Sequence, residues 1–145
     1  MEADSLKTVV FDDQRISDLV SKANDVDTFG DVFHSIGVEK DGEIIGGVVY
    51  NLASKTNICM HVASTEPAWM TKQFLFFAFA YPFLQLNKRR VTGLVPAKNI
   101  NAQKFDEKLG FKFEGIMRHG DTDDDLIIYG MLKEECRFIG ADYAR

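Results

Sequence analysis

Cysteine is scarce in this chain of 145 residues, and Cys59 and Cys136 lack the close spacing of metal ligands. Neither a disulfide framework nor a metal centre is therefore predicted. Hydrophobic residues make up 46% of the chain, enough for the core of one domain of this length. We expect a single domain over residues 1–145, working in a reducing, cytoplasmic setting.

The chain also lacks an excess of basic residues and a long apolar run. Its 17 Lys and Arg against 22 Asp and Glu give a net charge of −5, whereas a general nucleic-acid binder is basic. The longest apolar stretch, residues 74–84, falls well short of the roughly 20 residues that span a bilayer. The N-terminus shows no secretory signal. No nucleic-acid or membrane partner is predicted.

Hydrophobic periodicity and turn signals predict an α+β domain. A hairpin turn is expected at Asp41-Gly42, and a bulge or a close backbone approach at Gly46-Gly47. A weak helix is expected over 13–23 and a long one from a cap near residues 64–67 to about residue 86, kinked or ended early by Pro82. Strands are expected over residues 8–11, 33–40, 43–52, 57–63, 90–95, 111–117 and 126–132.

The segment 91–113 carries the most specific pattern, a strand, a short helix, an abrupt stop and a second strand. Asn99 is a suitable N-cap, and apolar residues follow it at helical spacing. Gly110 can supply the left-handed residue that ends the helix. Phe111 then falls where it can fold back on Phe105.

This string, N-x-x-A-(x)7-G-F after a strand, resembles the last helix of the GNAT superfamily of acetyl-CoA-dependent N-acetyltransferases. The order of elements over about residues 33–132 is also similar to the core of that family. Residues 74–115 look closest to the group that acetylates N-terminal amines of ribosomal proteins. The resemblance implies a single-domain GNAT-like fold, a mixed, mostly antiparallel twisted sheet flanked by helices. Acetyl-CoA would lie where the fourth and fifth strands splay apart.

The resemblance also implies where the cofactor binds. Its pyrophosphate would sit at the N-terminus of the helix after the fourth strand, where free N–H groups favour an anion. The family's R-G-x-G-x-A-T loop is altered here, because Thr65 replaces the arginine, and Glu66 and Ala68 replace the glycines. Asn99 is equally well explained as a helix cap, whereas Trp69 and Met70 are better explained as core or cleft-wall residues. The implied cofactor-binding residues are Val62, Ala63, Ala68, Trp69, Met70, Thr71, Lys72 and Asn99.

His61 and Glu66 are the predicted catalytic residues, as bases that deprotonate the amine. His61 would lie on the fourth strand near the cleft, and an ordinary histidine pKa near 6.5 suits proton transfer at neutral pH. A structural role for a lone strand histidine is the alternative. Many family members carry a tyrosine as general acid at the position of Asp106. An aspartate is expected to be ionised there and a poor proton donor.

The last hairpin lines the acceptor side in this family, which implies substrate-binding roles for His119, Asp121, Asp123 and Tyr129. The aspartates could attract a cationic amine, although a solvated turn explains them too. Tyr129 is equally suited to cross-strand packing. The aspartates imitate the start of a calcium-binding loop, but the required glycine and glutamate are absent, so no metal is predicted.

The implied function is transfer of an acetyl group from acetyl-CoA to an amine by direct attack. The amine could be a small molecule, a protein N-terminus or a lysine. The altered phosphate loop and the missing tyrosine favour an alternative, a catalytically degenerate GNAT-fold binding module that contacts a protein partner. Such a compact chain would suit a phage-encoded protein in the host cytoplasm. A membrane-surface role for residues 74–84 is a third hypothesis, which the acidic charge opposes. The sequence does not decide the identity of the acceptor or whether the chain forms a homodimer.

Overall fold

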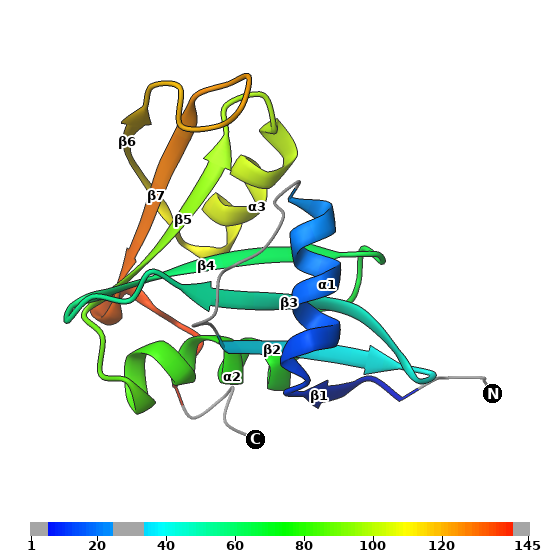
Figure 1. Ribbon diagram of the computed structural model, residues 1–145. Coiled ribbons are helices and arrows are strands. Elements are labelled where there is room, and N and C mark those ends of the chain that lie inside the picture. Colours follow the sequence, from blue (N-terminus) through cyan, green and yellow to red (C-terminus); the bar gives the residue numbers. More distant parts are fainter. Residues whose placement is uncertain (1–5, 25–33, 141–145) are drawn as a thin grey trace.

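The computed structural model describes residues 6–24 and 34–140, in which seven strands form one sheet flanked by three α-helices (Figure 1). A π-helical turn, Tyr81–Gln85, follows α2, and a 3-10 turn, Lys133–Glu135, follows β7. No helix in this described part is long and apolar enough to cross a membrane. The elements are β1 (Thr8–Val10), α1 (Asp13–Ala23), β2 (His34–Lys40), β3 (Glu43–Asn51), β4 (Asn57–Ser64), α2 (Lys72–Ala80), β5 (Arg90–Pro96), α3 (Ile100–Leu109), β6 (Lys112–Met117) and β7 (Leu126–Leu132).

The strands lie in the order β1-β2-β3-β4-β5-β7-β6. Only β4 and β5 pair in parallel, and every other neighbouring pair in the sheet is antiparallel. This confirms the predicted α+β fold with a mixed, mostly antiparallel sheet. The predicted strand bounds agree with the structure to within a residue, except that residue 33 lies outside the described residues.

The sheet separates two hydrophobic clusters, because alternate side chains of a strand point to opposite faces. On β3, Val49 packs with Ile16 and Val20 of α1 on one face. Its neighbours Val48 and Tyr50 point to the other face, into the main core that also contains α2. One helix layer therefore covers each face of this part of the sheet.

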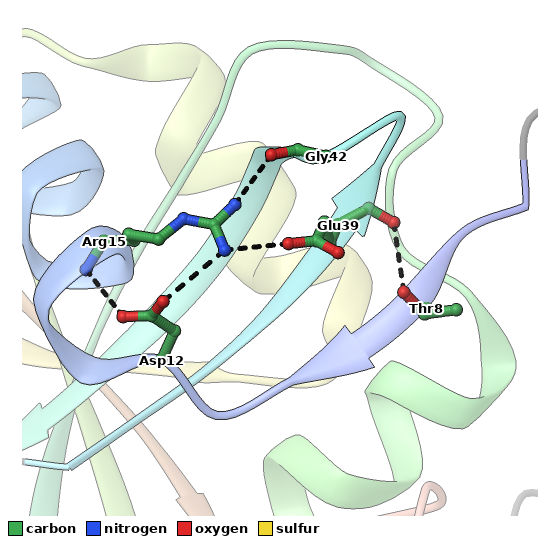
Figure 2. Close-up of polar contacts among 5 residues, drawn as sticks. All are labelled: Thr8, Asp12, Arg15, Glu39 and Gly42. Atoms are coloured by element: carbon green, nitrogen blue, oxygen red, sulfur yellow. Dashed lines mark hydrogen bonds and ion pairs between the residues drawn. The ribbon is translucent and has the colours of Figure 1, made fainter.

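Arg15 fixes α1 to the β2–β3 hairpin (Figure 2). Its guanidinium bonds Glu39 Oε2 at 2.8 Å through Nη1 and donates to the Gly42 carbonyl at 2.9 Å through Nη2. Asp12 caps the helix by accepting from the Arg15 backbone N–H at 3.1 Å. These contacts join the first turn of α1 to the hairpin, and in Figure 1 the C-terminal end of α1 points toward α3.

The helix after β4 differs from its prediction. It was expected to begin near residues 64–67, but α2 begins at Lys72, with Thr71 as N-cap, and spans nine residues. The cap at Thr71 is local, because its Oγ1 accepts from the Phe74 N–H at 3.0 Å. The predicted disruption at Pro82 is confirmed, since α2 ends at Ala80 and the π-helical turn begins at Tyr81.

The chemistry of Pro82 explains one buried hydrogen bond. Proline has no N–H, so the Ala78 carbonyl lacks its usual helical donor four residues later. The hydroxyl of the buried Tyr50, on β3, donates to this carbonyl at 2.5 Å. The strand therefore supplies the partner that the helix cannot.

Replacing Tyr50 by phenylalanine should lower the free energy of unfolding by about 1–3 kcal/mol, because the buried Ala78 carbonyl loses its donor. Urea denaturation measures the loss. Tyr129→Phe is a matched control, since it removes a hydroxyl whose partner, Glu107, is exposed and can bind water instead. Equal losses in the two variants would contradict this account.

Candidate active-site cleft

The cleft begins where the pairing of β4 with β5 stops. The two strands pair over three positions only, Asn57 with Arg90, Ile58 with Val91 and Cys59 with Thr92. Beyond them the strands diverge (Figure 1), and residues of α3 line the opening. A cavity of about 320 Å³ occupies this opening. It is lined by Ala23, Asn24, Met60, His61, Val62, Ala63, Ser64, Trp69, Gly93, Leu94, Val95, Pro96, Asn99, Ala102, Phe105 and Asp106.

A polar network holds the strands together at their paired end. Thr92 Oγ1 donates to Asn57 Oδ1 at 2.6 Å, and Arg90 Nε donates to the same oxygen at 3.2 Å. Arg90 also forms an ion pair with Glu114 of β6 at 2.7 Å. Gly130 of β7 leaves room for this pair, since a Cβ there would stand 2.2 Å from a Glu114 oxygen. The paired end is therefore clamped by side chains.

Backbone groups of β4 face the opening. The Thr65 N–H donates to the Ile45 carbonyl of β3 at 2.8 Å. Since backbone groups alternate between the two edges of a strand, those of Val62 and Ser64 point away from β3, toward the opening. The Val62 carbonyl lies 3.5 Å from Asn24 Nδ2 of α1, in agreement with this direction. By the same alternation the Ala63 N–H points toward β3.

The predicted ends of α3 are confirmed. Asn99 caps the helix, since its Oδ1 accepts from the Ala102 N–H at 3.1 Å, and it also lines the cleft. Gly110 has a φ of 112°, and the N–H groups of Gly110 and Phe111 close the helix end at 3.0 Å each. The expected packing of Phe111 differs, because its ring lies against Phe79, at 6.2 Å between centroids, whereas Phe105 lines the cleft.

The loop between β4 and α2 holds most of the predicted phosphate-binding residues. Thr71 and Lys72 lie at the N-terminus of α2, as the prediction requires of an anion site, although the helix begins later than expected. The Ala68 carbonyl accepts from Lys7 Nζ at 2.7 Å, which brings a cation to the loop. Met70 lines a small apolar void of about 20 Å³ rather than the cleft.

Trp69 is buried and also lines the cleft. Its ring lies over Gly46, where a Cβ would stand 2.3 Å from a ring carbon. The predicted close approach at Gly46 is thus confirmed. The bulge lies beside it, because Ile45 has no partner on β2, where the pairs Val38–Gly46 and Glu39–Ile44 follow each other.

Glu66 does not line the cleft. Its carboxylate forms an ion pair with Lys40 Nζ at 3.2 Å, five residues before the N-cap of α2. The structure therefore does not place Glu66 with the other predicted catalytic residue.

His61 lines the cleft, as predicted, but its acid–base character differs from the prediction. Its Nε2 lies 2.7 Å from Asn51 Oδ1. Burial lowers the pKa of His61 from 6.5 to about 4. The imidazole is therefore neutral at pH 7 and a weaker base than an exposed histidine, which corrects the expectation of a base near 6.5.

Asp106 overturns a second expectation. Its carboxyl group projects from α3, and Asp106 lines both the cleft and the small apolar void. Burial, with a smaller contribution from the charge of Glu107, raises the pKa of Asp106 from 3.8 to about 7. The group is therefore substantially protonated at neutral pH, and the prediction of a fully ionised aspartate was wrong.

The residues predicted on the last hairpin do not line the cleft. His119, Asp121 and Asp123 are exposed in the β6–β7 loop. That loop is tied to the β5–α3 connection, where the Lys98 N–H donates to Asp124 Oδ2 at 2.7 Å, so it flanks the mouth near Asn99.

Within the described residues, no cluster of histidine, cysteine or acidic side chains could hold a metal ion.

Tyr129 is a packing residue. It is only 2% exposed, its ring lies edge-on to Phe113, and its hydroxyl donates to Glu107 Oε2 at 3.0 Å. Burial, followed by Glu107, raises the pKa of Tyr129 to about 12. This corrects the substrate-binding role given to it and agrees with the packing alternative.

Several cleft residues had no predicted site role, among them Ala23 at the end of α1, its C-cap Asn24, and Gly93 of β5. A Cβ on Gly93 would stand 3.1 Å from Asp106 Oδ2, so a glycine there makes room for the carboxyl group. A glycine within the predicted strand 90–95 was the one available signal, since it often marks a close approach. Nothing in the local sequence pairs it with Asp106.

No model of a known protein family matches the chain, and neither does any curated protein. Solved structures match its fold. Mutant forms of the spermidine/spermine N-acetyltransferase SpeG from Vibrio cholerae align with a TM-score of 0.71 and 14% identity, over 89% of this chain and 96% of theirs. SpeG in complex with CoA and spermine aligns at 0.63 and 17%, over 74% and 69%. A protein of T. thermophilus described as an acetyltransferase aligns at 0.63 and 21%, over 77% and 64%. The chain therefore has the N-acetyltransferase fold.

The raised pKa of Asp106 predicts a pH-dependent effect on stability. Between the unfolded pKa near 3.8 and the folded pKa near 7, only the folded state holds this proton. The wild type should therefore lose about 1.4 kcal/mol per pH unit relative to Asp106→Asn as the pH rises through this window. Above pH 7 the difference in the free energy of unfolding between the two proteins should become constant, with Asp106→Asn the more stable.

Denaturation of both proteins at a series of pH values measures the difference. The comparison with the variant is needed because His61 also titrates in this range. Its pKa is lowered, so it costs stability as the pH falls from 6.5 toward 4, and this contribution is the same in both proteins. Salt should change the difference little, since burial is the main cause. A difference that is constant from pH 4 to 8 would show that Asp106 titrates normally.

Proposed function

We propose that this chain is a GNAT-superfamily N-acetyltransferase that transfers an acetyl group from acetyl-CoA to an amine. The opening between β4 and β5 carries the proposal, because it exposes backbone groups in the middle of a sheet. Such groups need partners. The fold shared with N-acetyltransferases supports this, as does the CoA and spermine complex of SpeG.

The residues present fit acetyl-CoA in two places. The backbone groups of Val62 and Ser64 at the edge of β4 match the amides of a pantetheine arm lying as an added strand. The N-terminus of α2, with Thr71 and Lys72 and with Lys7 beside the preceding loop, suits a pyrophosphate. The Glu66 carboxylate, which would repel phosphates there, is held by Lys40 instead.

When bound, acetyl-CoA supplies a thioester whose acyl carbon is open to attack and whose sulfur can leave. The residues of this chain would position the thioester and polarise its carbonyl group. The Val62 N–H points into the opening, where it can donate to a carbonyl oxygen that gains negative charge. Apolar walls from Leu94, Ala102 and Phe105 exclude water and strengthen that hydrogen bond.

The acceptor amine would enter at the mouth flanked by Asn24 of α1 and the β6–β7 loop. Asp121 and Asp123 on this loop would raise the local concentration of a cationic amine before it loses its proton in the cleft. The N-terminal amine of a protein fits the resemblance to the ribosomal-protein group, and a small polyamine is the acceptor type that SpeG binds.

A binding module without catalysis is the second candidate function. The loop from residue 65 to 71 contains no glycine, and Trp69 fills its inner side against Gly46. A backbone without glycine approaches phosphates less closely. Such a chain would keep the fold and contact a protein partner instead.

Acetyl-CoA should raise the melting temperature of the wild type if the proposal holds. Ligand at 100 times its dissociation constant adds about 2.7 kcal/mol of stability. Lys72→Ala and Asn99→Ala should weaken acetyl-CoA binding and so reduce the shift. Lys55→Ala is the charge-matched control, since Lys55 is exposed in the β3–β4 loop, and it should leave the shift unchanged.

Thermal denaturation with and without acetyl-CoA makes the measurement, followed by mass spectrometry of spermine and of an alanyl peptide after incubation. A shift together with an acetylated amine supports the enzyme. A wild type that shows no shift at millimolar acetyl-CoA would exclude the enzyme and favour the binding module.

A further inference from the structure

Asp106 lies between the cleft and the small apolar void, since it lines both. Its Oδ2 faces the backbone of β5 at Gly93, a position without a side chain, 3.1 Å from where a Cβ would stand. On one side the carboxyl group borders the cleft, and on the other it borders the small void formed with Met60, Phe74 and Phe79. Within residues 6–24 and 34–140, no hydrogen bond or ion pair joins this carboxyl group to another residue.

The charged and titratable groups near Asp106 are few. Glu107, next to it on α3, accepts the Tyr129 hydroxyl of β7. Burial, and to a smaller extent the charge of Glu107, disfavours ionisation of Asp106. From β4, His61 faces the cleft as a neutral imidazole, with Nε2 against Asn51. From α2, only hydrocarbon faces the void, and β5 presents Gly93.

His61 and Asp106 are the only ionisable side chains among the described residues that line the cleft. Acyl transfer from a thioester to an amine needs two proton movements. The N–C bond forms as the C–S bond breaks, the nitrogen loses a proton, and the sulfur gains one. A base and an acid are usually separate residues. With a pKa near 4, His61 is too weak a base for the first movement.

We propose that the Asp106 carboxyl group performs both movements, taking the proton that the amine nitrogen loses and giving it to the departing sulfur. This rests on the proposed acetyl transfer. Each turnover begins with the carboxylate and returns to it, so atoms and charge balance without a second titrating side chain. The position between the cleft and the apolar void limits the contact of the carboxyl group with bulk water.

Two results distinguish a carboxyl group that acts as both base and acid from one that acts as an acid only. Activity should rise with pH through the titration of Asp106 and then level off, since the ionised form starts the cycle. An acid alone would instead lose activity as the pH rises. Removing the charge of Glu107 should move the rising limb to lower pH, because a neighbouring negative charge holds the pKa up.

The first test needs no acetyl-CoA. The carboxyl carbons of the full chain are titrated by NMR, and the signal of Asp106 is identified by its absence in Asp106→Asn. A midpoint near pH 7 supports the proposal, and Glu107→Gln should lower that midpoint. A midpoint near 4 overturns it, whether or not the chain binds acetyl-CoA.

The second test uses acetyl-CoA with spermine and an alanyl peptide as acceptors, with mass spectrometry of the acetylated product. Asp106→Asn should lower kcat by about 100-fold or more while leaving the KM for acetyl-CoA within about 2-fold, and should abolish the rising pH limb. Asp18→Asn removes the same charge from the exposed face of α1 and should not change the activity. The melting temperature of each variant confirms that it is folded.

The outcomes separate this inference from the proposed function. An active wild type with an Asp106→Asn variant that keeps more than about a third of its kcat overturns the proton carrier and leaves the acetyltransferase standing. Wild-type activity that falls as the pH rises through 7 would also overturn the proton carrier and leave the acetyltransferase standing. A wild type that acetylates neither acceptor and shows no thermal shift removes both.

Discussion

The short parallel pairing of β4 with β5 is the constraint on which the rest of this structure depends. Three paired positions hold the strands, and the Asn57–Thr92–Arg90 network with Glu114 clamps them there. The twist of a sheet alone would not separate neighbouring strands. Beyond those positions the two strands diverge, and the cavity lined by β4, β5 and α3 lies between them.

That opening gives the cleft two unlike walls. The β4 wall presents backbone groups, whereas α3 presents Asn99, Ala102, Phe105 and Asp106 along one side. A polar strand edge beside a helix that presents both apolar and polar side chains suits an extended ligand with regularly spaced amides. Such surroundings also shift the ionisation of any titratable group held in them, and His61 and Asp106 move in opposite directions for the same reason.

Sequence patterns within a few residues predicted most helices and strands, but only some of the site residues. The Asn99 cap and the Gly110 stop were readable because both depend on bonds within a few residues. The start of α2 was misplaced, because Ser64, Thr65 and Pro67 imitate a helix entrance while the cap is Thr71. Glu66 and Tyr129 were assigned to the site by resemblance, yet their partners are Lys40 and Glu107, each supplied by another element.

The sequence by itself determined the order and type of the elements, since hydrophobic periodicity, caps and turn residues act over short distances. The tertiary structure alone decided how far β4 and β5 pair, which side chains meet in the opening, and how those groups ionise. The physical reason is that pKa values and cleft walls depend on burial by residues distant in sequence, as where Gly93 admits the carboxyl group of Asp106.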